Sequence, residues 1–402
     1  MNYESQRVQR ITASPSMTIS LQAKAMRANG INVIDLSLGE PDFDTPEHIV
    51  DAAERAMRNG QTRYTAADGT PELKAAIVQK FQRENGLTFA STEISVANGA
   101  KQSIFNALQA TLEPGDEVVI PAPYWVSYSD MVTLLGGTPV TLECGAEQGF
   151  LMSASRLANS ITSKTRWVIL NSPSNPSGAI YDQQQWVELG AVLAKFPRVL
   201  ILSDEIYEHI IYDQSFVSFG NACPELRDRT LLVNGVSKTY AMTGWRIGYA
   251  AGPKGLIAAM GKIQSQTTGN PCSIAQAAAV EALNGPQTFL APMVAEYKTR
   301  RDLVVGELRK ISGLEVINPA GAFYAFPRCS SYFGMQTPEG VVINNDTDLS
   351  AYLLRQAHVA TVPGAAFGLA SYIRLSCATS QSVLADAVQR IKSALEQLAP
   401  VN

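Results

Sequence analysis

Short apolar runs alternate with longer helical patterns through the middle of the chain. The runs are residues 117–120, 138–142, 167–170, 199–202, 230–233 and 247–250. This alternation predicts βαβ units and a mostly parallel sheet, so the expected fold class is α/β. Polar loops at residues 172–178 and 203–207 follow two of the runs. Open α/β sheets bind ligands beyond the carboxyl ends of their strands, so we expect a site there.

The two ends of the chain have a different pattern. A helix is predicted for residues 16–30, then a short strand at 33–36, and a helix from 46 to 59 that Gly60 stops. A long charged helical segment, residues 292–312, leads into a C-terminal α+β region. We expect the N-terminal segment to fold back on that region. The predicted domains are therefore a large one at 46–299 and a small α+β one from 1–45 and 300–402.

Composition narrows the possible partners and location. The 402 residues suffice for two domains with a large core, and 46% hydrophobic with 17% charged residues is ordinary for a soluble enzyme. A net charge of −4 argues against binding to nucleic acid or an anionic membrane. No apolar run approaches the length of a membrane span, and the first residues lack a signal-peptide core.

Cysteine and histidine spacing indicates neither disulfides nor metal. The five cysteines are scattered without CxxC spacing, which is typical of free thiols in a reducing cytosol. We therefore expect a cytoplasmic protein. His48, His209 and His358 form no metal-like cluster in the sequence, so no metal site is expected. The chain has no P-loop and no GxGxxG, so nucleotide binding has no sequence support.

The segment 236–248 carries the most informative chemistry. Lys238 follows Ser237, and Arg246 comes eight positions later between Gly244 and Gly248. A lysine can bond covalently to an aldehyde cofactor, and an arginine nearby can bind its phosphate. A lone Ser-Lys pair usually marks a solvated surface charge.

Two further residues support a cofactor-binding role for Lys238. Asp204 and Tyr207 follow the apolar run 199–202 and offer the carboxylate and phenol that a pyridine cofactor uses. A lysine combined with an acidic partner for the ring nitrogen is the signature of a pyridoxal 5'-phosphate (PLP) site. The order Asp204, Tyr207, Ser237, Lys238 and Arg246 therefore predicts such a site.

With these motifs the chain resembles the fold type I PLP-dependent aminotransferases over nearly its whole length. In particular it resembles bacterial aspartate aminotransferases of subgroup Ib, also called 1-gamma. The matching segments are residues 39–43, 123–128, 171–178, 236–248 and 374–376. The resemblance implies the fold type I architecture and transamination from L-aspartate to 2-oxoglutarate, which yields oxaloacetate and L-glutamate.

The resemblance assigns roles around the cofactor ring. Lys238 would hold PLP covalently and, once released, carry the substrate Cα proton. Asp204 would pair with the protonated ring nitrogen, Tyr207 and Asn175 would bind the phenolic oxygen, and Trp125 would stack on the ring. Taken alone, Asp204 could be a helix N-cap, Asn175 a turn residue and Trp125 a core aromatic.

The phosphate requires several donors. Arg246 and Ser237 are side-chain candidates, and Gly99 and Ala100 precede a helix predicted at 101–112, whose first N–H groups attract anions. Tyr64 matches a family position that reaches the phosphate of the neighbouring subunit. The resemblance therefore implies a homodimer with shared active sites.

Substrate recognition is assigned to a second set of residues. Arg374 would clamp the α-carboxylate, because a planar guanidinium fits a carboxylate with two hydrogen bonds, and the Gly39 backbone would close over it. Many aspartate aminotransferases bind the distal carboxylate with a second arginine from the partner subunit, but no arginine lies between Arg246 and Arg300 here. Subgroup Ib uses a lysine after the Gly-Ala turn instead. The resemblance therefore implies that Lys101 binds the distal carboxylate beside the cofactor. Alone, Arg374 could be an ion-pair residue and Lys101 a surface charge.

Several alternatives stay open. Arg374 would serve aromatic, prephenate or alanine aminotransferases and cysteine-conjugate β-lyases equally well. Family members that accept prephenate typically carry a lysine or arginine where this chain has Ser14, which argues against prephenate. PLP-binding transcriptional regulators carry an added basic DNA-binding domain, whereas this acidic chain enters the aminotransferase segment within about 30 residues. The expected partners are thus small amino acids and 2-oxo acids.

Overall fold

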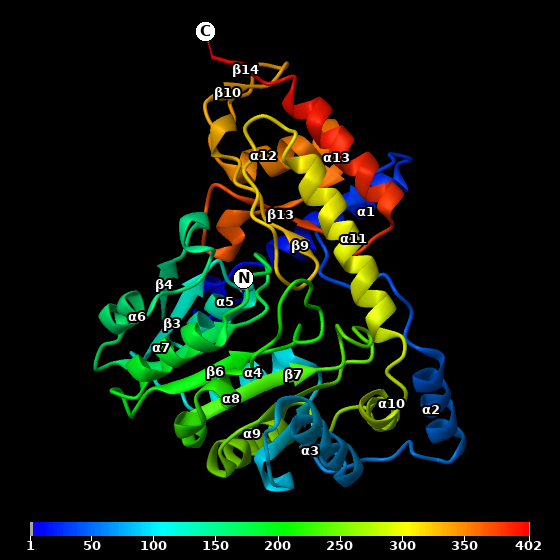
Figure 1. Ribbon diagram of the computed structural model, residues 1–402, viewed down its shortest axis with the longest axis vertical. Coiled ribbons are helices and arrows are strands. Elements are labelled where there is room, and N and C mark those ends of the chain that lie inside the picture. The colour runs from blue at the N-terminus through cyan, green and yellow to red at the C-terminus, as the bar shows by residue number, and fades with distance from the viewer. Residues whose placement is uncertain (1–2, 402) are drawn as a thin grey trace.

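The computed structural model describes residues 3–401 and forms an α/β fold (Figure 1). The helices are α1 Pro15–Ala28, α2 Glu47–Arg58, α3 Pro71–Asn85, α4 Ala100–Gln109, α5 Ser127–Leu134, α6 Ala154–Ser160, α7 Gln183–Leu193, α8 Phe219–Ala222, α9 Lys254–Thr267, α10 Ser273–Asn284, α11 Leu290–Leu308, α12 Asp346–Tyr352 and α13 Gln381–Leu395. The strands are β1 Ile34–Asp35, β2 Ile94–Ala97, β3 Glu117–Ala122, β4 Thr138–Glu143, β5 Thr165–Asn171, β6 Leu200–Asp204, β7 Thr230–Gly235, β8 Gly248–Ala251, β9 Tyr324–Ala325, β10 Met335–Gln336, β11 Val359–Ala360, β12 Val362–Pro363, β13 Ile373–Ser376 and β14 Ala399–Pro400.

A mixed sheet forms the centre of the molecule. Within residues 3–401 it has seven strands in the order β2-β8-β7-β6-β5-β3-β4. The strands from β7 to β4 pair in parallel, whereas β8 is antiparallel to both β7 and β2. The predicted mostly parallel sheet is confirmed. The sequence patterns did not reveal β2, and they did not show that β8 runs in the opposite direction.

Strand residues alternate between two helical layers, as a pleated strand requires. Val118 and Trp167 pack with α4, α5 and α9 on one face. Their neighbours Val119 and Val168 pack with α6, α7 and α8 on the other. Both faces are covered, which explains why these strands read as continuous apolar runs rather than alternating ones. Helices α2, α3 and α10 pack with β2 and β8 in a further cluster.

Local signals fix the helix ends near the sheet. Thr70 caps α3 by accepting a hydrogen bond from the Leu73 N–H, and Pro71 occupies the first helical position. Gly86 ends α3 with a left-handed φ of 66°. Gly60 follows α2 with a φ of 73°, which confirms the predicted stop.

The two chain ends meet above the sheet. β1 pairs in parallel with β11, where Ile34 lies beside Val359. Ile34 also belongs to a core cluster formed with α11, α12 and α13. In Figure 1 the blue α1 lies among the orange and red C-terminal elements, which confirms that the N-terminal segment folds back on them. The boundaries at 45/46 and 299/300 stay predictions, since α11 runs unbroken across the second.

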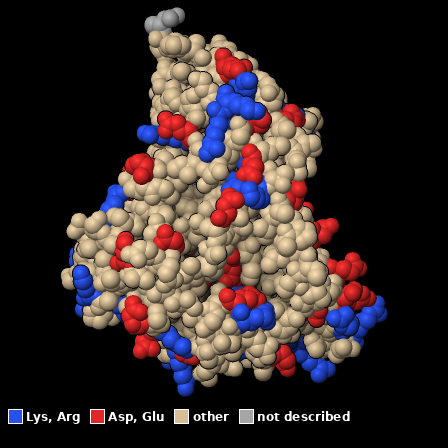
Figure 2. Space-filling view, in the orientation of Figure 1, with Lys and Arg blue, Asp and Glu red and all other residues tan. Residues whose placement is uncertain are grey.

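The surface shows no strongly polarised face in the view of Figure 2. Lysine and arginine are interspersed with aspartate and glutamate there, without a broad region of one sign. Among the described residues, no helix is both long and apolar enough to cross a lipid bilayer.

Candidate active site

Strand ends of the central sheet open into a cavity of about 370 Å³. β5 ends at Asn171, β6 ends at Asp204, and the chain leaves β7 towards Lys238. The predicted site residues that line this cavity are Gly39, Ala100, Lys101, Trp125, Asn175, Asp204, Tyr207, Ser237, Lys238, Arg246 and Arg374. Residues spread over more than 300 positions of the sequence are thus brought together at the carboxyl edge of the sheet.

Asp204 is a buried carboxylate at the end of β6. The Tyr128 hydroxyl donates a hydrogen bond of 2.6 Å to its Oδ2, and the Ile206 N–H donates one of 3.2 Å to Oδ1. Burial raises the pKa of Asp204 to about 6, although both hydrogen bonds act in the opposite direction. A cationic ring nitrogen beside this carboxylate would offset its lost hydration and favour the charged pair.

Lys238 faces the same cavity from the loop after β7. Its Nζ donates a hydrogen bond of 2.6 Å to the Gly39 carbonyl oxygen. Burial, with smaller contributions from Arg374 and Arg246, lowers the pKa of Lys238 to about 8, although Glu40 and Asp204 act in the opposite direction. Its amine is therefore neutral in a large fraction of molecules near pH 8, as a nucleophile and proton carrier requires.

Arg374 is held from three sides. Nη1 donates a hydrogen bond of 2.9 Å to Asn175 Oδ1, and Nη2 donates one to the Ser37 carbonyl oxygen. The guanidinium carbon lies 4.6 Å from the Tyr324 ring centroid and 4.9 Å from that of Phe367. Nε is buried without a partner among the described residues. A buried, charged and only partly satisfied guanidinium is suited to binding a carboxylate.

An anion cradle lies at the start of α4. Gly99 precedes the helix with a left-handed φ of 87°, and a Cβ there would collide with the Arg246 guanidinium. Arg246 Nη2 donates a hydrogen bond of 3.2 Å to the Asn98 carbonyl, and Nη1 donates one of 2.9 Å to the Thr243 carbonyl. The free N–H groups of the helix start thus lie beside a fixed arginine, which is a favourable arrangement for phosphate.

Lys101 lies at the exposed mouth of the cavity. Its Nζ is 4.8 Å from the centroid of the Trp125 ring. Partial burial lowers the pKa of Lys101, and the nearby Arg246 lowers it further. The residue therefore presents a cation next to the aromatic wall of the cavity.

Tyr64 is not brought to this cavity. It lies between α2 and α3 and is 98% exposed. It borders a separate hollow with Gly60, Gln61 and Arg63. Within the described chain Tyr64 therefore does not line the cavity that contains Lys238.

Sequence reasoning missed several residues of the site. Tyr128 lies in the matching segment 123–128, but the sequence predicts no role for it. Its hydroxyl contacts Asp204, which is 76 residues away in the sequence. Tyr324 donates or accepts a hydrogen bond of 2.7 Å with Tyr207 and had no sequence signal. Asn171 Nδ2 donates to the Asp204 carbonyl oxygen at 2.9 Å, a contact that only the pairing of β5 with β6 creates.

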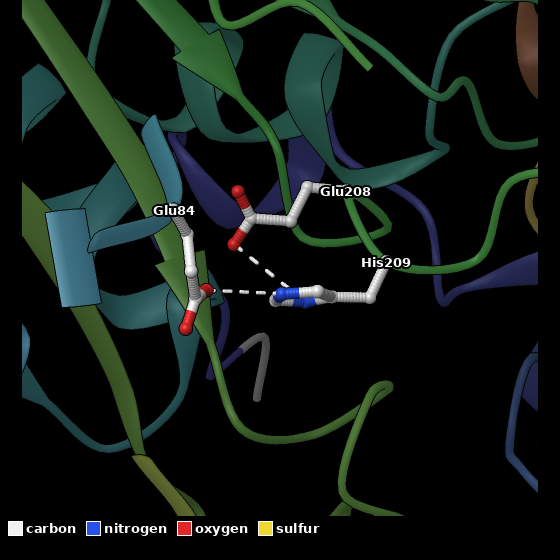
Figure 3. Close-up of side chains that lie close together, drawn as sticks. All are labelled: Glu84, Glu208 and His209. Atoms are coloured by element: carbon white, nitrogen blue, oxygen red, sulfur yellow. Dashed lines mark hydrogen bonds and ion pairs between the residues drawn. The ribbon is translucent and has the colours of Figure 1, made fainter. Parts of the chain in front are cut away.

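A second polar cluster, formed by Glu84, Glu208 and His209, lies outside the lining of the cavity (Figure 3). His209 Nε2 is 3.0 Å from Glu84 Oε2, and His209 Nδ1 is 3.7 Å from Glu208 Oε1. The spacing of these three groups could suit a metal ion. However, the buried ammonium of Lys80 forms ion pairs with both carboxylates. A positive charge of the protein itself therefore already compensates this cluster. No sequence pattern predicts that Glu84 joins it.

The cavity residues fit PLP. A buried carboxylate, a neutralisable lysine, three phenols, an aromatic wall and an anion cradle surround one space. These are the donor types that a phosphorylated pyridine aldehyde needs.

Comparisons with known proteins agree with this chemistry. The family model described as "Aminotransferase class I and II" matches residues 31–391. An aspartate aminotransferase of Rhizobium meliloti (strain 1021) is 54% identical over 98% of this chain and 96% of its own length. An aspartate/prephenate aminotransferase of Cereibacter sphaeroides is 51% identical over 98% of each chain.

Solved structures give the same result. The aspartate aminotransferase of Rhizobium meliloti superimposes with a TM-score of 0.96 at 53% identity, covering 99% of this chain and 100% of the other. The Thermus thermophilus aspartate aminotransferase with maleate has a TM-score of 0.91 at 40% identity, covering 98% and 100%. The chain therefore belongs to the class I and II aminotransferases, enzymes of the PLP-dependent fold type I.

Proposed function

We propose that this enzyme transfers the amino group of L-aspartate to 2-oxoglutarate and forms oxaloacetate and L-glutamate. The observation that carries the proposal is that Arg374 and Lys101 line one cavity together with Lys238. Two cations there match the two carboxylates of aspartate and of glutamate. Relatives named aspartate aminotransferase, and one solved with the dicarboxylate maleate, support the same choice.

The proposed mechanism assigns one task to each side chain. PLP, when bound, supplies an electron-withdrawing ring that stabilises negative charge at the substrate Cα. Lys238 takes the Cα proton with its neutral amine and later returns it. Asp204 keeps a positive charge on the ring nitrogen, while Tyr207 and Asn175 bind the phenolic oxygen.

Substrate and cofactor are positioned by the remaining residues. Arg374 fixes the α-carboxylate, and with it the direction of the Cα–H bond, beneath the Gly39 backbone. Trp125 covers one face of the ring. Gly99, Ala100, Ser237 and Arg246 would bind the phosphate, and Lys101, which is near them, would bind the distal carboxylate of the substrate.

We also infer that the working unit is a cytoplasmic homodimer in which Tyr64 reaches the phosphate of the other subunit. The 98% exposure of a tyrosine beside a surface hollow supports this inference. The cysteines of the described chain are free thiols, four of them buried, which suits a reducing compartment. Amino acids and 2-oxo acids are the expected partners, without nucleic acid or membrane.

A second candidate is prephenate as amino acceptor, because the relative from Cereibacter sphaeroides is named aspartate/prephenate aminotransferase. Ser14 lines the cavity of this chain and presents a hydroxyl instead of a cation. A ring-bound carboxylate would gain less from a neutral hydroxyl than from a charged partner. We therefore place prephenate second.

A panel of amino donors with 2-oxoglutarate, followed by acceptors with L-aspartate, tests the proposal. We expect aspartate to have the highest kcat/KM and phenylalanine, alanine and prephenate to be poorer. A higher kcat/KM for an aromatic or small apolar donor would refute the dicarboxylate assignment. Release of pyruvate and ammonia from cysteine conjugates, without amino transfer, would instead indicate a β-lyase.

A further inference from the structure

Tyr324 contacts three residues of the proposed site, namely Tyr207, Arg374 and Gly39. Its hydroxyl lies 2.7 Å from that of Tyr207. Its ring stacks on the Arg374 guanidinium with a centroid distance of 4.6 Å. A Cβ at position 39 would collide with the Tyr324 hydroxyl, so that hydroxyl packs directly against Gly39. Tyr324 belongs to β9, whereas Tyr207 follows β6, so the contact joins the small sheet to the central one.

The chemistry of the pair determines which hydroxyl donates. Each phenol has a single hydrogen to donate. Both hydroxyls are buried, since Tyr207 is 3% and Tyr324 is 1% exposed, and water therefore offers no ready substitute. If Tyr207 donates its hydrogen to the phenolic oxygen of the cofactor, its own oxygen can only accept from Tyr324.

We propose that Tyr324 is a positioning residue that directs the Tyr207 O–H towards the cofactor by donating a hydrogen bond to the Tyr207 oxygen. The inference rests on the proposed role of Tyr207. The Tyr324 hydroxyl acts through Tyr207, whereas the Tyr324 ring acts separately by packing on Arg374. The two contributions can therefore be separated by removing the hydroxyl alone.

The test uses Tyr324→Phe, Tyr207→Phe and the double variant in the PLP-loaded enzyme without substrate. The measured quantity is the pH midpoint of the change in visible absorbance. A donor to the phenolic oxygen stabilises its anionic form and so favours loss of the proton from the cofactor-bound lysine nitrogen. Losing that donor should raise the midpoint. One neutral hydrogen bond corresponds to about half to one pH unit, which is the shift expected for Tyr324→Phe.

The double variant separates two effects of Tyr324: its hydrogen bond to the Tyr207 hydroxyl and the packing of its ring on Arg374. We expect Tyr207→Phe to raise the midpoint at least as much, and the double variant to match Tyr207→Phe. The KM for aspartate should change less than about twofold in Tyr324→Phe, because the ring that supports Arg374 remains. Tyr352→Phe is the matched control, since that buried hydroxyl donates 2.8 Å to the Ala394 carbonyl away from the cavity. Its midpoint should equal that of the parent.

The possible failures are distinguishable. An unchanged midpoint in Tyr324→Phe with a raised one in Tyr207→Phe would overturn the role of Tyr324 and leave that of Tyr207 intact. A Tyr324→Phe shift that persists in the Tyr207→Phe background would also overturn it, because the effect would then travel through Arg374 or Gly39. An unchanged midpoint in Tyr207→Phe would refute the proposed role of Tyr207 itself.

Discussion

The inner and outer halves of the cavity are built differently. We define the inner half as Asp204, Tyr207 and Arg374, which are 5%, 3% and 2% exposed. The outer half comprises Lys101 and Arg246, which are both exposed, and we group with it Tyr64, which is 98% exposed and lies outside the cavity. Hydrogen bonds within the chain orient the inner residues and also Arg246, whereas Lys101 and Tyr64 present a charge and an aromatic ring to solvent.

This difference separates chemistry from recognition. In the buried half, low polarity raises the pKa of Asp204, and burial of the neighbouring Lys238 lowers the pKa of its amine. Electrostatic interactions are also stronger there than in water. In the exposed half, solvent weakens the same interactions until a ligand or a second subunit covers them. Changes to the inner half should therefore abolish catalysis, and changes to the outer half should alter selectivity and assembly.

The largest expected effect concerns the buried carboxylate. Asp204→Asn keeps the shape and removes the charge that would stabilise the protonated ring nitrogen. A loss of several kcal/mol in transition-state stabilisation corresponds to a fall in kcat of about a thousandfold or more. Steady-state kinetics at saturating PLP measure it. An Asp204→Asn enzyme within tenfold of the parent would contradict the role.

The neighbouring residue provides a matched control for that variant. Glu205 is equally buried, but its Oε1 accepts hydrogen bonds from Ser203, Ser218 and the Phe219 N–H, away from the cavity. A glutamine oxygen can accept the same bonds. Glu205→Gln should therefore keep kcat within about threefold of the parent. A loss as large as that of Asp204→Asn would mean that any buried charge change at the end of β6 disrupts the site.

The next effect concerns Lys238 in the cofactor-free enzyme. Burial lowers its pKa from 10.5 to about 8, so the neutral amine dominates above pH 8. At pH 8 about half of the amines would be neutral, on the order of a hundredfold more than at an ordinary lysine. The rate of covalent PLP attachment, followed by absorbance, should rise with pH to a midpoint near 8. A midpoint close to 10.5 would show that burial does not activate this lysine.

Lys101 tests the outer half. Loss of one partner from a desolvated charge pair costs about 2–5 kcal/mol. Lys101→Ala should therefore lower kcat/KM for aspartate by roughly 30-fold or more, with a much smaller effect on phenylalanine. Lys254→Ala is the control, because that lysine also begins a helix but lies away from the cavity. An unchanged aspartate-to-phenylalanine ratio would remove Lys101 from the specificity site.

The smallest expected signal concerns assembly. A defective Tyr64→Ala chain and a defective Lys238→Ala chain should restore activity when they are unfolded, mixed and refolded together. In a two-fold symmetric dimer, random mixing gives one intact site in half of the dimers, or about a quarter of parental activity. Each variant refolded alone is the control. A fully active monomer, or no recovery on mixing, would contradict the shared site.

The sequence predicts the main residues of the site but not the residues that contact them. The end of an apolar run locates Asp204, and the order of motifs locates Lys238 and Arg374, because strand ends of one sheet converge. The partners of these residues could not be predicted in that way. Tyr128 contacts Asp204 across 76 positions, and Tyr324 contacts Tyr207 across 117, through packing of separate elements.

The fold shows the same limit. Runs between residues 117 and 233 predicted the parallel strands, because β3, β5, β6 and β7 are buried on both faces, and only the edge strand β4 is partly exposed. The sequence patterns predicted neither β2 nor the antiparallel direction of β8, because an apolar pattern carries no information on strand direction or order. The ion pair of Lys80 with Glu208 likewise depends on the packing of α3 against the segment after β6, whereas Lys80 and Glu84 lie one turn apart in α3 itself.

The attachment point of the cofactor tests the central claim most directly. The PLP-loaded enzyme would be reduced with borohydride, digested and analysed by peptide mass spectrometry. The account predicts the reduced cofactor on Lys238, whose amine is the buried one lining the cavity beside Asp204 and Tyr207. The cofactor on any other lysine would contradict the account.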